Sequence, residues 1–134
     1  MKRLLIIEDN KMMRTFLENY FKKDFRIDLH ESPSKALRTF KNDLSEKFDL
    51  IISDFKPKGH PEFNALRSFL NTSKSSGIPC IMLTDEDKSS QRLASFTLSA
   101  RDSISKPFNP GELNLRVKSI TNQLISKPQL RSVA

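Results

Sequence analysis

The residues Asp49-Leu50-Ile51-Ile52-Ser53-Asp54-Phe55-Lys56-Pro57 are the most informative segment of the chain, because an apolar run here ends in one carboxylate, Asp54. Leu50 to Ile52 are consecutive apolar residues, two of them β-branched, which predicts a strand buried on both faces. Strands of this kind belong to parallel sheets that are covered by helices. Pro57 and Gly59 then end the strand, so Asp54 is expected at the sheet edge where open α/β folds bind ligands.

Apolar runs recur along the chain, and each is followed by apolar residues at helical spacing. Continuous runs predict buried strands, whereas the alternation of Phe25, Ile27 and Leu29 with polar residues predicts a more exposed strand near an edge of the sheet. The expected strands cover residues 4–7, 25–29, 50–52, 78–84 and 102–105, and the expected helices cover residues 12–21, 33–44, 63–70, 85–96 and 110–125.

Five repeats of a strand and a helix, joined by right-handed crossovers, predict an α/β fold with a parallel five-stranded sheet between two layers of helices. We expect the strand order 2-1-3-4-5. The carboxyl ends of parallel strands share one edge of the sheet, so the polar residues that close the strands are expected to meet there. These residues are Glu8, Asp9, Asp54, Thr84 and Lys106.

Two of the helices carry further expectations. The first follows a predicted N-cap at Asn10 and is expected to turn its whole apolar stripe toward the core. The fourth is expected to begin on the acids Asp85 to Asp87, where the helix macrodipole favours negative charge, and to turn its apolar residues inward. The stripes consist of Met12, Met13, Phe16, Leu17, Tyr20 and Phe21 in the first helix, and of Leu93, Ala94 and Phe96 in the fourth.

Length and composition limit the class of protein. The 134 residues fit one domain, expected over residues 1–126, with a polar tail over residues 127–134. Cys80 is the single cysteine and lies in an apolar run, so we expect a small core residue in a reducing compartment. The apolar stretch near the N-terminus is too short for a signal segment or a membrane span, and we expect a cytoplasmic protein without a membrane partner.

The formal net charge of +7 suits an acidic partner such as a nucleic acid. The basic residues are scattered along the chain, however, and no nucleic-acid-binding motif accompanies them. We therefore expect solvated basic faces and no direct contact with nucleic acid.

Three carboxylates at one edge, those of Glu8, Asp9 and Asp54, repel one another unless cations compensate them. With one positive charge from Lys106, the group leaves room for a divalent cation, and an oxygen cage with few protein ligands suits Mg²⁺. Asp54 is then the natural nucleophile, because a carboxylate can attack phosphorus and form an aspartyl phosphate. Thr84 can donate a hydrogen bond to the transferring group, and Lys106 can neutralise charge on its oxygens.

Each of these residues has an ordinary structural explanation when it is taken alone. Asp54 could be a carboxylate in a turn, and the pair Glu8-Asp9 could cap a helix N-terminus. Thr84 could be an ordinary hydroxyl at a strand end, and Lys106 could be one of many surface lysines. Their convergence at the ends of four strands favours a functional site.

The same residues resemble the receiver domain of two-component response regulators. The resemblance covers residues 2–125, and its motifs are highly specific as a set. They are Leu5-Ile6-Ile7-Glu8-Asp9-Asn10, Asp49-Leu50-Ile51-Ile52-Ser53-Asp54, Leu83-Thr84 and Ser105-Lys106-Pro107-Phe108.

The resemblance implies a flavodoxin-like fold and phosphorylation of Asp54 by a histidine kinase or a histidine phosphotransfer protein, with Mg²⁺ as the cofactor. It implies that Asp9 binds the metal directly, that Glu8 does so through water, and that Asp54 and the backbone carbonyl of Lys56 supply further ligands. Such a domain is expected to be no enzyme beyond slow self-catalysed phosphoryl transfer and dephosphorylation.

The resemblance also implies a switch. Thr84 and Lys106 are expected to contact the phosphoryl group, and the aromatic residue that follows the movement of the threonine in the family falls here at Ser103. The surface that changes is expected on the fourth helix, fifth strand and fifth helix, a face that also suits a homodimer.

The sequence departs from the family pattern at several positions. Pro57 lies three residues past the acceptor instead of four, and Lys56 and Lys58 put positive charge beside the metal pocket, where an ammonium group could weaken Mg²⁺ binding or stand in for it. Asp85, at a position that is normally small, adds bulk and negative charge near the phosphoryl site. Ser103 lacks the bulky rotamer on which the usual switch depends.

Two alternatives stay open beside the phosphoacceptor. A pseudo-receiver that binds a partner without phosphorylation is favoured by Lys56, Asp85 and Ser103 and opposed by the intact acidic site. A metal-dependent phosphohydrolase needs an acid/base carboxylate two residues after the nucleophile, where this chain has Lys56.

Overall fold

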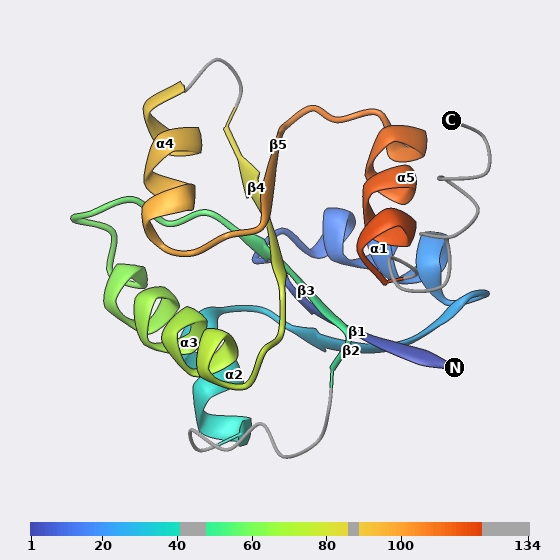
Figure 1. Ribbon diagram of the computed structural model, residues 1–134, viewed down its shortest axis with the longest axis horizontal. Helices are drawn as coiled ribbons and strands as arrows, with labels where there is room; N and C mark the ends of the chain where they lie inside the picture. The colour runs from blue at the N-terminus through green and yellow to red at the C-terminus, as the bar shows by residue number, and fades with distance from the viewer. Residues whose placement is uncertain (41–47, 86–88, 122–134) are drawn as a thin grey trace, which may run out of the picture.

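The computed structural model describes residues 1–40, 48–85 and 89–121 of the chain. Within these ranges five strands alternate with five helices (Figure 1). The strands are β1 (Lys2–Ile7), β2 (Phe25–His30), β3 (Leu50–Asp54), β4 (Cys80–Thr84) and β5 (Asp102–Ser105). The helices are α1 (Lys11–Phe21), α2 (Pro33–Phe40), α3 (Phe63–Ser75), α4 (Ser89–Thr97) and α5 (Pro110–Thr121).

The five strands form one sheet in which every neighbouring pair is parallel, in the order β2-β1-β3-β4-β5. This confirms the predicted fold class and strand order. In the register Ile7 lies opposite Ser53, Asp54 opposite Leu83, and Thr84 opposite Ser105. The carboxyl ends of the strands therefore share one edge, as the sequence predicts.

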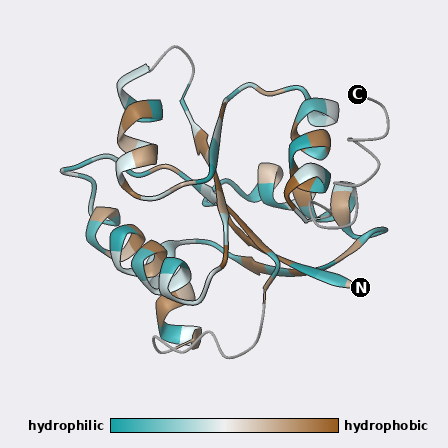
Figure 2. Cartoon of the chain, viewed as in Figure 1, coloured by the Kyte–Doolittle hydropathy of each residue, from teal (hydrophilic) through white to brown (hydrophobic). Residues whose placement is uncertain are grey.

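The helices cover both faces of the sheet, with α1 and α5 on one side and α2, α3 and α4 on the other (Figure 1). Side chains alternate between the faces along each strand, so Leu4 and Ile6 join one core cluster while Leu5 and Ile7 join the other. Figure 2 shows the resulting hydrophobic strands at the centre of the molecule. β3 and β4 are buried throughout, whereas the edge strand β2 is largely half-buried, which confirms its predicted exposure.

Cys80 is the first residue of β4 and lies inside one of these clusters. Its side chain is buried, and this burial raises the pKa of the thiol to about 12. The prediction of a core cysteine is confirmed.

α1 begins as predicted, because the side-chain oxygen of Asn10 accepts a hydrogen bond of 2.9 Å from the backbone N–H of Met13. The prediction that its whole apolar stripe is core is wrong. Leu17 and Phe21 are buried, but Met12 is 81% exposed. Successive residues on a helix are about 100° apart, so one row four residues apart can face the sheet while the neighbouring row faces solvent. The exposed row consists of Met12, Phe16 and Tyr20.

α4 also differs from the prediction. The helix begins at Ser89, after Asp85, and Glu86 and Asp87 lie outside the described residues. Leu93 is 69% exposed and Phe96 49% exposed, and the buried position of the helix belongs to Ser95. The Ser95 hydroxyl can be buried because it donates a hydrogen bond of 2.8 Å to the carbonyl of Gln91.

The ends of the predicted domain stay predictions. α5 ends at Thr121, and Leu124, Ile125 and the predicted tail over residues 127–134 lie outside the described residues, as does Leu44 of the second apolar stripe. Among the helices that the structure describes, none has the length and apolar character that crossing a membrane requires.

The buried and the exposed row of α1 predict unequal losses of stability on truncation. We expect Leu17→Ala to lower the free energy of unfolding by about 2–5 kcal/mol, because it leaves a cavity between α1 and the sheet. Met12→Ala removes a solvent-exposed side chain and should change it by less than about 0.5 kcal/mol. Urea unfolding followed by circular dichroism measures both, and equal losses would contradict the assigned orientation of the helix.

Candidate functional site

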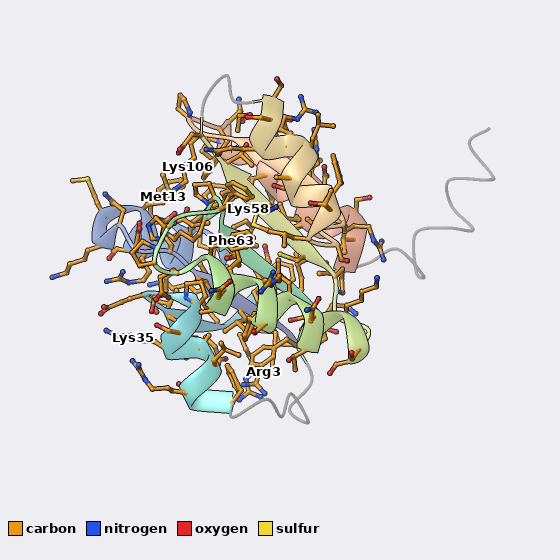
Figure 3. All side chains as sticks on the ribbon, turned by 90° about the vertical axis from the view of Figure 1, so that its left-hand side faces the viewer. Arg3, Met13, Lys35, Lys58, Phe63 and Lys106 are labelled. Atoms are coloured by element: carbon orange, nitrogen blue, oxygen red, sulfur yellow. The ribbon has the colours of Figure 1, made fainter. Side chains whose placement is uncertain are left out.

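The carboxyl edge of the sheet gathers ionisable side chains from the ends of three strands. Glu8 and Asp9 follow β1, Asp54 closes β3 and Lys106 follows β5. Figure 3 shows Lys106 toward one end of the molecule and Arg3, near the start of β1, toward the other. The structure thus gathers the four charged side chains of the predicted site into one cluster.

Lys106 links the strand ends directly. Its ammonium nitrogen lies 2.5 Å from Oδ1 of Asp54 and 2.8 Å from Oε1 of Glu8. Glu8 is fully buried and Asp54 is 5% exposed, so both carboxylates are shielded from water, whereas the Lys106 side chain is 26% exposed. The backbone N–H of Asp9 adds a hydrogen bond of 3.2 Å to Oδ2 of Asp54.

Lys56 supplies a second cation. The sequence predicts its positive charge beside the metal pocket but does not predict which carboxylate it contacts. Its ammonium nitrogen lies 2.6 Å from Oδ2 of Asp9 and 3.9 Å from Oδ2 of Asp54. The resemblance assigns only its backbone carbonyl a role. The signal for the side chain is the spacing of two residues from Asp54, because alternate residues of an extended chain point to the same side.

The cluster shifts the pKa values of its members. Burial, together with the neighbouring Asp54, raises the pKa of Glu8 to about 7. The hydrogen bond from Lys56 holds the pKa of Asp9 below its usual value. Burial alone would lower the pKa of Lys106, but the carboxylates of Asp54 and Glu8 hold it above its usual value. Lys106 therefore remains charged, and the carboxyl group of Glu8 titrates near neutral pH.

The three acids also fit a metal ion. Glu8, Asp9 and Asp54 each offer a carboxylate oxygen, and the three oxygens lie within 4.8 Å of one another. Hard oxygen donors of this kind are the ligands that Mg²⁺ prefers. The donor set therefore suits the divalent ion that the sequence predicts.

Thr84 closes β4 at the same edge and is buried. Its hydroxyl oxygen lies 3.4 Å from the hydroxyl oxygen of Ser105, the residue before Lys106. Asp85 is exposed, and its side chain accepts a hydrogen bond of 3.3 Å from the amide of Gln91 in α4. The strand end is therefore connected both to β5 and to α4.

Ser103 lies on β5 opposite Met82, on the strand pair that also carries Thr84 and Ser105. Its side chain is 5% exposed, and within the described part of the chain its hydroxyl oxygen is buried without a hydrogen-bond partner. A serine at this position leaves no large side chain that could move between a buried and an exposed rotamer.

Comparison with known proteins identifies the family. A model of the response regulator receiver domain matches residues 4–118 of the chain. The chain belongs to this family, as its motifs predict, and is a receiver domain of the kind found in two-component signalling.

Several known proteins share this sequence pattern over part of their length. The chain is 32% identical over 117 residues to Histidine kinase P4 of Formosa agariphila, covering 87% of this chain and 8% of that protein. It is 31% identical over 119 residues to the uncharacterized transcriptional regulatory protein YclJ of Bacillus subtilis, covering 88% of this chain and 50% of that protein. It is 29% identical to the transcriptional regulatory protein ResD of the same species, covering 88% of this chain and 47% of that protein. The chain thus spans about half or less of these relatives.

Solved structures confirm the flavodoxin-like fold. A CheY-like receiver domain from Methanospirillum hungatei superposes with a TM-score of 0.76 at 21% identity, covering 95% of this chain and 98% of that chain. A response regulator structure from Chloroflexus aurantiacus gives a TM-score of 0.74 at 27% identity, covering 90% of this chain and 97% of that chain.

The raised pKa of Glu8 predicts a dependence of stability on pH. The metal-free folded state holds a proton that the unfolded state releases above its ordinary pKa of 4.5, so stability falls as the pH rises from there to about 7. Glu8→Gln mimics the neutral form and removes this fall. Relative to wild type, its free energy of unfolding should rise by about 2–3 kcal/mol between pH 5 and pH 8.

Urea unfolding at several pH values in the presence of a chelator measures this difference. His30, whose pKa burial lowers, contributes equally to both proteins and cancels in the comparison. Parallel stability curves for the two proteins would contradict the shift.

The unpartnered hydroxyl of Ser103 predicts a stabilising substitution. Ser103→Ala removes a buried polar group without a partner and should raise the free energy of unfolding by about 1 kcal/mol. Ser53→Ala is the matched control, because the Ser53 hydroxyl is also buried but donates a hydrogen bond of 3.0 Å to the carbonyl of Asp54. The control should lose about 1 kcal/mol in the same urea unfolding experiment. A loss at both positions would show that the Ser103 hydroxyl is satisfied.

Proposed function

We propose that this receiver domain accepts a phosphoryl group on Asp54 from a histidine kinase or a histidine phosphotransfer protein. The observation that carries the proposal is the environment of Asp54. Its carboxylate is fixed at the end of a buried strand, pairs with the ammonium group of Lys106, and lies beside the carboxylates of Glu8 and Asp9. A nucleophile, a compensating cation and a set of metal ligands thus share one edge of the sheet.

The proposed transfer balances at the phosphorus atom. A carboxylate oxygen of Asp54 forms a bond to phosphorus while the bond from phosphorus to the donor's imidazole nitrogen breaks, and that nitrogen keeps the electron pair. Lys106 stabilises the negative charge on the phosphoryl oxygens, and the hydroxyl of Thr84 donates to one of them. The strand ends fix the positions of these groups, because Asp54 closes β3, Thr84 closes β4 and Lys106 follows β5.

Mg²⁺ is part of the proposal, with Glu8, Asp9, Asp54 and the backbone carbonyl of Lys56 as the residues that would hold it. When bound, the ion supplies charge neutralisation for the phosphoryl oxygens. The protein's own contribution is to bring the acids of two strands together at an edge that leaves Asp9 open to solvent.

The proposed output is a change at a protein-binding face. Phosphorylation adds roughly two negative charges at Asp54, and these can draw Thr84 toward the phosphoryl group and displace the neighbouring start of α4. The α4 residues Leu93 and Phe96 and the α5 residue Leu115 expose apolar surface that suits a partner protein or a second copy of the chain. A cytoplasmic location and no enzymatic activity beyond slow self-catalysed phosphoryl transfer and dephosphorylation belong to the same proposal.

A pseudo-receiver is the second candidate, and two observations favour it. The ammonium group of Lys56 already engages Asp9, and Ser103 lacks the aromatic side chain of the usual switch. A phosphohydrolase gains no support, because Lys56 stands where that activity needs a carboxylate.

Intact-mass analysis after incubation with Mg²⁺ and acetyl phosphate tests the proposal. We expect wild type to gain one phosphoryl group and Asp54→Asn to gain none, because the amide is a poor nucleophile. Asp85→Asn is the matched control, since it removes the nearest exposed aspartate beyond Thr84 and should keep the gain.

Two outcomes would contradict the phosphoacceptor. Wild type without added mass under conditions in which Mg²⁺ binds would favour the pseudo-receiver. A gain of mass that persists in Asp54→Asn would place the phosphoryl group on another residue.

A further inference from the structure

The acidic pocket holds two internal cations, which divide its carboxylates between them. Lys106 pairs with Glu8 and with Oδ1 of Asp54, whereas Lys56 pairs with Asp9 and lies 3.9 Å from Oδ2 of Asp54. Three formal negative charges thus face two positive ones. The carboxylates that would hold a divalent ion are largely compensated by the protein itself.

The position of Lys56 sets it apart from the other lysine in the same loop. Its side chain is 8% exposed, which is unusual for a lysine and requires its charge to be paired. Lys58, two residues further along, is exposed. The pairing of Lys56 with Asp9 therefore depends on the specific buried position of this side chain, and a basic loop alone does not explain it.

We propose that the ammonium group of Lys56 is a tethered cation that occupies the space of the divalent metal between Asp9 and Asp54 and competes with Mg²⁺ for these carboxylates. The inference rests on the proposed function, since it concerns the metal of the phosphorylation site. Lys56 holds the pocket in a metal-free resting state, and metal binding requires its side chain to move out into solvent.

Mass action gives the size of the effect. The apparent affinity for the metal falls by the fraction of molecules in which the pocket is open. If the ammonium group is in place in about nine molecules of ten or more, Mg²⁺ binds about tenfold or more weakly than it would to the open pocket. The backbone carbonyl at position 56 is the same in any side-chain variant, so a substitution there removes the competitor and leaves every expected ligand in place.

Lys56→Met tests the competition, with Lys58→Met as the matched control that removes the same charge from an exposed position. Titration calorimetry with Mg²⁺ in the absence of any phosphodonor should show binding about tenfold or more tighter for Lys56→Met than for wild type. Lys58→Met should stay within about twofold, because exposed charges are screened.

Thermal unfolding of the same proteins gives a second measure. Without metal, Lys56→Met should melt below wild type, because Asp9 and Asp54 lose a counter-charge, and Mg²⁺ should raise its melting temperature by more than it raises that of wild type. If the methionine variant does not fold without metal, Lys56→Gln provides a polar neutral side chain for the same titration.

A third measure follows the lysine itself. Labelling with a limiting amount of an amine-reactive reagent, quantified by peptide mass spectrometry, should increase at Lys56 when Mg²⁺ is added and stay constant at Lys58.

Unchanged or weaker Mg²⁺ binding in Lys56→Met, or an equal gain in Lys58→Met, would overturn the inference. Neither result bears on whether Asp54 accepts a phosphoryl group, which the mass analysis of wild type decides. Conversely, a wild type that gains no phosphoryl group at a Mg²⁺ concentration that saturates its own site, while Lys56→Met binds Mg²⁺ more tightly, would reject the phosphoacceptor and retain the competition.

Discussion

The contact of Lys106 with Asp54 and Glu8 is the interaction on which the carboxyl edge of the sheet depends. Parallel pairing brings the ends of β1 and β3 together, and here those ends are acids that are almost completely buried. Two buried carboxylates at this spacing repel each other, and part of that repulsion appears in the raised pKa of Glu8. The ammonium group that follows β5 compensates both. Lys106, which lies 98 positions from Glu8 along the chain, thus offsets the repulsion between acids that the parallel pairing of β1 and β3 brings together.

The sequence allowed the sheet and most of the site to be predicted, because both depend on strong local signals. Continuous apolar runs such as Leu50 to Ile52 predict buried parallel strands, and parallel strands fix where Glu8, Asp54 and Lys106 meet. The ammonium contact of Lys56 could not be predicted in the same way, because the path of a loop and the rotamer of a long side chain depend on tertiary contacts. The inward row of α1 and the inward face of α4 were missed for a related reason. Several helical rows on one helix are apolar, and only the packed structure decides which of them is covered.

Two buried serines lie in the region where α4 packs near β5. Ser95 is the buried residue of α4, and Ser103 is a buried residue of β5. A serine whose hydroxyl is satisfied within its own helix brings little apolar area to the core, so α4 gains less hydrophobic stabilisation than α1 does from Leu17 and Phe21. Elements with little apolar burial are the ones that open at low free energy. α4 is therefore held less firmly on the sheet than α1 is.

The reactivity of Cys80 can report local opening of the central sheet. It is the single thiol of the chain, it begins the strand that Thr84 ends, and its raised pKa leaves almost no thiolate at neutral pH. Reagents that modify thiols need both access and the thiolate, and the folded state denies them both. The rate of thiol modification at Cys80 therefore measures how often β4 opens locally. A change of that rate on addition of Mg²⁺ or a phosphodonor would show how much the occupied site stabilises β4.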